Sequence, residues 1–511
     1  MEPNRREWRI HTRVPGAEHW TAEYAARYVG TYPKGNSMNR SLLLLVHVCA
    51  FATAGAQIAT TSTLPAEYQR IARDVLTEAV NTNTAASNGS TTALANKLRV
   101  RLLAAGYPAG DIHIVGSDPK NRNLIVRLRG RAEGKKPILL AAHLDVVEAK
   151  KADWTADPFV LRMENGYFMG RGADDDKSGV TTLITNFIRW KREGWVPSRD
   201  IIGFFSADEE TTAQKGIIWT LAHERALIDA EYALNTDGGG VELANEQPRA
   251  FDIEASEKVF VSFRFEVTNP GGHSSRPRPD NAIYTLARAL TRVEQYTFPV
   301  RLNEVSRTEL ERSAALQKPD TAADMRLVAA GYANGNPDAA AVSAMTRLSR
   351  DPSFNALFRT TCVATMLDGG HADNALPQRA RATVNCRMLP NDPPADVERT
   401  LKRLAGDSVS VVAINPPVPS DASPLRADLM SVLDRLAARY YPGAPVIPTM
   451  ALGASDGLYM RNAGIPTYSV SASASRDGES NDHGLNEKVR VKSIYDAAAF
   501  WYDMLHALAD E

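Results

Sequence analysis

The sequence predicts an α/β protein with a central mixed sheet flanked by helices, into which a smaller ferredoxin-like α+β domain is inserted. Three observations predict this fold. The chain has 511 residues, too many for one hydrophobic core. Continuous apolar runs alternate with helical patterns, as in sheets covered on both faces. Near residue 258 the pattern changes to strict alternation of apolar and polar residues, typical of a half-exposed antiparallel strand.

The N-terminal residues are predicted to precede the folded protein. Residues 1–37 are a polar extension without a clear pattern, so Met38 is an alternative start to Met1. Residues 38–56 contain one arginine, an apolar core and small residues at the C-terminal end, a pattern typical of a signal peptide cleaved near Ala56. The apolar run is shorter than the ~20 residues that span a bilayer, which disfavours a stable membrane anchor. The mature protein is therefore expected to be periplasmic or secreted.

The first part of the large domain is predicted at 64–256. Helical spacing of apolar residues predicts helices at 66–80 and 91–107, and the second stops at a glycine. Further strands and helices follow. The expected strands are 123–130, 137–147, 200–210 and 231–240, and the expected helices are 178–192 and 213–226.

The inserted domain is predicted at 257–415, and residues 416–511 complete the large domain. Its order is strand, helix, strand, strand, helix, strand, which is the ferredoxin-like arrangement. An alanine-rich stretch at 303–355 is expected to be an additional helical insertion. After the strand from 258, the expected elements are a helix at 280–296, strands at 358–367 and 380–388, a helix at 394–405 and a strand at 408–414.

Charge and cysteine content restrict the possible partners. With 59 Lys and Arg against 60 Asp and Glu, the net charge of -1 gives no indication of a nucleic-acid or anionic membrane partner. Removal of Cys49 with the signal peptide leaves Cys362 and Cys386, on adjacent strands of the predicted hairpin. They could pair in an oxidising compartment, but the register of the strands is open, and so is the disulfide.

Metal-type ligands follow four predicted strand ends of the large domain. The carboxyl ends of such strands gather ligands in open α/β sheets, and imidazoles mixed with carboxylates suit zinc or a similar divalent ion. Each piece alone has an ordinary alternative, such as a core histidine or a solvated acidic loop. So many converging carboxylates, however, would repel one another without a cation. The residues are His143, Asp145, Asp174, Asp175, Asp176, Asp208, Glu209, Glu210 and Asp237, with His483 far downstream.

The motifs resemble those of the M20 family of zinc metallopeptidases, which includes carboxypeptidase G2-like, carnosinase-like and aminoacylase-1-like enzymes. The matching strings span residues 143–487 in the family's order. This resemblance implies a zinc-peptidase catalytic domain with an inserted dimerisation lid, and hence a homodimer. The strings are HLDVV, GRGADDDKSG, SADEE, NTDGGG, GGHSS, NALP and DHGLNE.

The resemblance also implies the metal ligands. Asp175 would bridge two divalent ions, most simply Zn²⁺ with Co²⁺ or Mn²⁺ as alternatives, while Asp174 fills a variable position. The peptide bond from Asp175 to Asp176 would be cis. The other ligands are His143 and Asp237 for one ion, and Glu210 and His483 for the second. Two ions that share a carboxylate can clamp a bridging water and lower its pKa.

Further roles follow from the same resemblance. Glu209 would be the general base, and Asp145 would accept the second N–H of the His143 ring and fix its tautomer. His273 would reach the active site of the neighbouring subunit and donate to the oxyanion. Substrate contacts are expected from Arg387, Asn374 and Ser455, with Arg387 on the free carboxylate.

The expected function is metal-dependent hydrolysis of an amide bond next to a free carboxylate, as in an M20-type exopeptidase or dipeptidase. An N-acyl-amino-acid amidohydrolase (an aminoacylase or deacylase) is the alternative within enzymes. A catalytically silent, dimeric binding protein is the alternative outside them. Such a protein would have little reason to keep Glu209 beside all five ligands.

Overall fold

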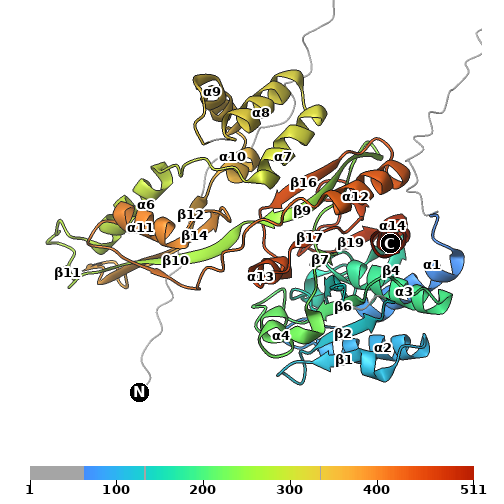
Figure 1. Cartoon of the computed structure of the whole chain (residues 1–511). Coiled ribbons are helices and arrows are strands. Elements are labelled where there is room, and N and C mark those ends of the chain that lie inside the picture. The colour runs from blue at the N-terminus through green and yellow to red at the C-terminus, as the bar shows by residue number, and fades with distance from the viewer. Residues whose placement is uncertain (1–61, 132–133, 334, 511) are drawn as a thin grey trace, which may run out of the picture. The chain divides into compact units, whose positions relative to one another are not determined.

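The computed structural model describes residues 62–131, 134–333 and 335–510 (Figure 1). The predicted polar extension and signal peptide lie outside these residues. Among the described helices, none is both long and apolar enough to cross a membrane.

The large sheet is mixed and has ten strands. Their order is β1-β2-β6-β3-β7-β17-β9-β8-β18, with β16 paired to β9. At its centre β6, β3 and β7 run parallel, so their carboxyl ends meet at one edge. The strands are β1 (Ile112–Val115), β2 (Asn123–Leu128), β3 (Ile138–His143), β6 (Ile201–Ser206), β7 (Tyr232–Asn235), β8 (Gly240–Ala244), β9 (Gln247–Glu257), β16 (Val446–Ala451), β17 (Thr467–Ser469) and β18 (Ala474–Ser475).

Helices cover both faces of this sheet, which confirms the predicted fold class. Alternate residues of β3 divide between two cores: Leu140 packs on one face and Leu139 on the other. The first face carries α1 (Ala66–Val80), α2 (Thr91–Ala104), α3 (Lys177–Glu193), α12 (Ala427–Tyr440) and α14 (Val491–Ala509). The second carries α4 (Ile217–His223), α5 (Arg225–Ile228) and α13 (Asp456–Asn462).

One predicted strand is divided. The run 231–240 forms β7 only as far as Asn235, and β8 starts again at Gly240. Gly238 and Gly239, which lie between the two strands, have φ of 103° and 68°, a region that extended strands do not use. The chain therefore turns directly after Asp237.

The small sheet has the ferredoxin-like order. Its strands are β10 (Val259–Thr268), β12 (Thr361–Gly369), β14 (Arg379–Met388) and β15 (Ser410–Ala413), in the order β12-β14-β10-β15, all antiparallel. The alternating apolar residues of β10 pack under α6 (Ala282–Gln295) and α11 (Pro394–Ala405). The alternation near residue 258 thus predicted this sheet correctly.

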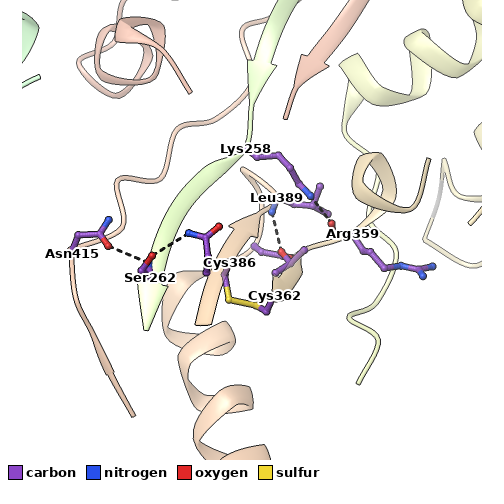
Figure 2. The surroundings of a disulfide bond; sticks show 10 residues. Lys258, Ser262, Arg359, Cys362, Cys386, Leu389 and Asn415 are labelled. Carbon is purple, nitrogen blue, oxygen red and sulfur yellow. Dashed lines mark hydrogen bonds between the residues drawn. A yellow bond between two sulfur atoms is a disulfide. The ribbon is translucent and has the colours of Figure 1, made fainter. Parts of the chain in front are cut away.

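The insertion at 303–355 is helical, as expected. It comprises α7 (Glu304–Ser313), α8 (Pro319–Gly331), α9 (Ala339–Leu348) and α10 (Pro352–Phe358), and it has its own apolar core. Lys258, where β9 continues into β10, is fully buried, and its Nζ donates to the carbonyls of Ala356 (2.6 Å) and Arg359 (2.8 Å). It therefore satisfies carbonyls at the end of α10 (Figure 2).

A disulfide links β12 to β14 (Figure 2). Cys362 and Cys386 stand directly opposite each other in the register, with their Cα atoms 4.1 Å apart. This pairing decides the register that the sequence left open. The next residue of β14 is Arg387, one of the predicted substrate contacts.

Candidate active site

Three of the predicted ligand segments meet at the carboxyl edge of the large sheet. His143 ends β3, Glu209 and Glu210 follow β6, and Asp237 follows β7. Because His143 pairs with Ser206 of the adjacent parallel strand, its ring lies beside the turn that carries the two glutamates. The sheet topology thus gathers side chains separated by up to 94 positions in the sequence.

The aspartate triplet comes from a different kind of element than expected. It does not end a strand of the large sheet; it follows β5 (Tyr167–Met169), which pairs with β4 (Arg162–Glu164) and β19 (Lys488–Arg490) in a separate sheet. The glycines of GRG turn the chain, and α3 starts at Lys177. Asp175 therefore lies at the positive end of a helix dipole, which favours its ionised form.

Asp175 lies between two imidazoles. Its Oδ1 is 2.9 Å from Nε2 of His143, and its Oδ2 is 3.0 Å from Nε2 of His483. The peptide bond to Asp176 is cis, as the resemblance implied. One carboxylate thus presents each of its oxygens to a different ring, which is the arrangement expected of a bridging ligand.

Two groups of side chains could each hold an ion. Ligand atoms of His143, Asp175 and Glu210 lie within 4.8 Å of one another, and so do those of His143, Glu209 and Asp237. His483 joins the first group, with its Nε2 3.0 Å from an oxygen of Glu210. One detail differs from expectation: Asp237 gathers with Glu209 as well as His143, rather than with His143 and Asp175.

The carboxylates of the site create an excess of negative charge that cations would compensate. Hydrogen bonds with Asp175 and Glu210 raise the pKa of His483 to about 10. Burial alone would lower the pKa of His143, but hydrogen bonds with Asp145 and Asp175 outweigh it and raise that pKa well above its usual value. Both shifts reflect the excess of carboxylates around the two rings. Two nitrogen and several oxygen donors around such negative charge fit a pair of divalent ions.

The two remaining carboxyls of the site are pushed toward their neutral forms. Burial, followed by the charge of Asp237, raises the pKa of Glu209 well above its usual value. Burial also raises the pKa of Asp237 well above its usual value. A glutamate whose pKa is raised in this way is better able to take up and release a proton near neutral pH.

Asp145 lies beside the Nδ1 side of the His143 ring and also holds a neighbouring turn. The His143 Nδ1 lies 3.1 Å from the backbone carbonyl of Asp145, and 3.7 Å from its carboxylate. The carbonyl and the carboxylate of Asp145 thus both lie on the Nδ1 side of the ring. The carboxylate also accepts the backbone N–H groups of Glu209 (3.1 Å) and Glu210 (3.0 Å), so Asp145 holds the turn that carries both glutamates.

His273 and Asn374 lie together, away from the other predicted residues. His273 is on β11 (Gly272–His273), which pairs with β13 (Ala375–Leu376), and the carbonyl of Asn374 accepts the N–H of Ser274 at 3.0 Å. Both side chains are exposed. The hydrogen bonds found for the His273 ring, among the described residues, are with Ser275 and not with a metal ligand.

Arg387 and Ser455 belong to adjacent segments. The Arg387 guanidinium lies over the Phe260 ring, 4.8 Å from its centroid, and reaches toward the carbonyl of Leu452 at 3.5 Å. Ser455 caps α13, and its hydroxyl donates to the buried Glu257 at 2.8 Å. The Arg387 guanidinium can thus bind an anionic group, whereas the Ser455 hydroxyl already donates its hydrogen bond to Glu257.

Sequence reasoning did not predict how Asp176, Arg171 and Glu487 organise the ligands. Asp176 accepts the N–H of His143 (3.2 Å) and the hydroxyl of Thr236 (2.8 Å), so it ties α3 to the ends of β3 and β7. Arg171 and Glu487 form a buried ion pair at 2.7 Å. Arg171 lies in the motif GRGADDDKSG, and Glu487 lies in the motif DHGLNE. The only sign of Glu487 in the sequence was an acidic residue four positions after His483.

A cavity of about 570 Å³ opens beside Asp175 and Asp237. Most of its lining residues are polar or glycine, including the glycines of 238–240, serines 471, 473 and 475, and several carboxylates. Val241 is its one aliphatic lining residue among those described. The space next to the ligands therefore suits a polar group better than an alkyl chain.

The fold and the site together define a metal-dependent hydrolase. The chain matches the model of peptidase family M20/M25/M40 over residues 139–507, and it belongs to that family. It is 28% identical over 400 residues to a probable carboxypeptidase S-like 2 of Dictyostelium discoideum, covering 75% of this chain and 74% of the relative. It is 26% identical over 390 residues to the mouse (Mus musculus) N-fatty-acyl-amino acid synthase/hydrolase PM20D1, covering 74% of this chain and 75% of the relative.

Solved structures share the fold. The M20 family metallo-carboxypeptidase Sso-CP2 of Sulfolobus solfataricus aligns with a TM-score of 0.63 and 19% identity, covering 85% of this chain and 98% of its own. Human carnosine dipeptidase 1 aligns with a TM-score of 0.55 and 17% identity, covering 86% and 98%. The family match and the two relatives identify the chain as an enzyme rather than a silent binding protein.

Proposed function

We propose that the protein is a two-metal exopeptidase or dipeptidase that cleaves an amide bond next to a free carboxylate. The observation that carries this proposal is the position of Asp175, whose two oxygens face the rings of His143 and His483 at 2.9 and 3.0 Å. A carboxylate placed in this way suits two cations side by side.

The residues present would divide between the two ions. His143 and Asp237 would hold one, Glu210 and His483 the other, and Asp175 both. Zinc is the proposed ion, since mixed imidazole and carboxylate donors suit it. Once bound, such ions polarise a carbonyl and lower the pKa of water.

Glu209 is the proposed general base. It lies half-buried beside His143 and Asp237, and its backbone N–H is held by Asp145. Its carboxylate would take a proton from the attacking water and pass it to the departing amine. Arg387, a half-buried guanidinium near the end of β14, would hold the free carboxylate of the substrate. Asn374 would assist from the small sheet, while Ser455 would act through its loop rather than its hydroxyl.

A second candidate is an N-acyl-amino-acid amidohydrolase, favoured by the printed name of the mouse relative. The chemistry of amide cleavage is the same, so the acyl group decides between the two. The polar cavity beside Asp175 favours a peptide over a fatty acyl group.

Dimer formation through the small sheet belongs to the proposal. β12 is an edge strand that exposes Val363 (61%), Met366 (69%) and Leu367 (72%), and α6 exposes Tyr284 (62%) beside it. Exposed apolar side chains on an open strand edge suit a second copy of the same surface. Export from the cytoplasm is also proposed, and the Cys362–Cys386 disulfide supports it.

Removal of metal tests the central proposal. We expect the zinc-loaded protein to hydrolyse dipeptides, and a chelator to abolish hydrolysis until zinc is restored. Initial rates over a panel of dipeptides and N-acyl amino acids would measure this and separate the two candidates. Hydrolysis that persists after chelation, with metal absent by elemental analysis, would contradict the proposal.

Mixed dimers test the role of His273. His273→Ala and Glu209→Gln homodimers should each be nearly inactive. Mixing them should restore up to about one quarter of wild-type activity, because random reassortment gives half heterodimers, each with one intact site. Heterodimers isolated with two affinity tags provide the measurement. If they remain inactive, His273 does not act across the interface.

A further inference from the structure

Glu487 has an unusually complete set of hydrogen-bond partners for a fully buried carboxylate. Its Oε1 accepts the N–H groups of Asp174 (2.9 Å) and Asp175 (3.1 Å). Its Oε2 accepts the N–H of Gly172 (2.8 Å) and a guanidinium N–H of Arg171 (2.7 Å). Four donors from one short turn thus converge on a single side chain that lies 312 positions from Asp175.

Arg171 extends this arrangement to the turn of His483. Its Nη2 donates to the carbonyls of His483 (3.3 Å) and Gly484 (2.8 Å), and its guanidinium lies over the Trp154 ring at 5.1 Å. His483 itself has φ of +59°, a left-handed conformation that is uncommon outside glycine and requires support. Arg171 supplies that support at the carbonyls of the ligand and of the residue after it.

The two residues therefore connect the turn of Asp175 to the turn of His483. Asp175 and His483 approach within 3.0 Å, but the strand pairing of β5 with β19 that brings their segments together ends at Met169 and Lys488, several residues short of both ligands. The Glu210 and Asp237 turns, by contrast, follow strands of the large sheet that pair with β3. The second ion, between Asp175, Glu210 and His483, depends on this connection more than the first.

From this geometry, and resting on the proposed function, we infer that Arg171 and Glu487 are positioning residues that set the affinity of the second metal ion. Neither touches the ion. They hold the bridging carboxylate and the His483 ring at the separation that one cation can occupy. Partners of this kind alter metal affinity by roughly 10–100-fold when removed.

Cobalt titration of the metal-free protein tests the inference. Calorimetry and the visible absorption of the bound ion monitor the titration. We expect the wild type to bind two equivalents. In Glu487→Gln the amide leaves one pair of donors without an acceptor, so the second equivalent should bind roughly 10–100-fold more weakly. The first should be unchanged. Arg171→Lys keeps the positive charge, but the lysine side chain cannot reach both carbonyls. It should weaken binding of the second ion and lower the stability of the protein less than Glu487→Gln does.

Glu257→Gln is the matched control, since Glu257 is equally buried and paired with Arg461 at 3.1 Å. It should lower the melting temperature but leave the second equivalent and its absorption unchanged. Wild-type affinity for both ions in Glu487→Gln and Arg171→Lys would overturn the inference, as would equal weakening in Glu257→Gln. A wild type that binds fewer than two ions would instead contradict the proposed function itself.

Discussion

Glu209→Gln should lower kcat by roughly 10²–10⁴-fold, the usual contribution of a general base, and leave KM nearly unchanged. The amide keeps the shape of the side chain but cannot accept a proton. Both ions should remain bound, because Glu209 is not one of the proposed ligands. Steady-state kinetics with metal analysis of the same sample provides the measurement.

Glu210→Gln is the matched comparison for this variant. The neighbouring amides of both residues are held by the same Asp145 carboxylate, so the two substitutions disturb the turn alike. Glu210→Gln should lose the second ion together with activity. Because ligand atoms of Glu209 also lie within 4.8 Å of His143 and Asp237, loss of an ion in Glu209→Gln would identify Glu209 as a ligand and refute its assignment as the base.

Asp175→Asn should have the largest effect of all, because one substitution removes a ligand from both ions. The neutral amide would also point an N–H₂ group at one of the two imidazoles that Asp175 now faces. Metal affinity should fall by more than the roughly 100-fold that loss of a supporting partner costs, and hydrolysis should fall below detection at ordinary metal concentrations. Elemental analysis after dialysis measures the bound metal.

Asp174→Asn is the control that the triplet itself provides. Its backbone N–H, not its side chain, is held by Glu487, and its carboxyl contributes no atom to the candidate metal groups. It should retain both ions. If Asp174→Asn released metal as readily as Asp175→Asn, the assignment of Asp175 as the bridging ligand would be wrong.

Local patterns were enough to predict most of the fold. The helices α1 and α11 begin and end at the predicted residues. The spacing of apolar residues that makes a helix amphipathic is local to the helix itself, so the sequence of the helix is enough to predict it. The ferredoxin-like order followed from the sequence of element types alone. The ligand set came from motif resemblance, and the structure brings His143, Asp175, Glu210 and His483 together.

What could not be predicted depends on distant contacts. The side chain of Glu487 gives no local sign that it will accept the amides of a turn more than 300 positions earlier. The second role of Asp145, as acceptor for two backbone amides, likewise arises only when β3 and β6 lie side by side. The register of β12 against β14 was open for the same reason, since two alternating strands can pair in several ways.

The disulfide between β12 and β14 stabilises the exposed edge strand of the small sheet. Closing a loop between residues 24 positions apart removes about 3 kcal/mol of chain entropy from the unfolded state. An outermost strand is normally the first to fray, but here it is fastened to its inner neighbour. The exposed side chains of Val363, Met366 and Leu367 are thus held on an ordered strand, so the proposed second copy would bind this surface with little loss of conformational entropy.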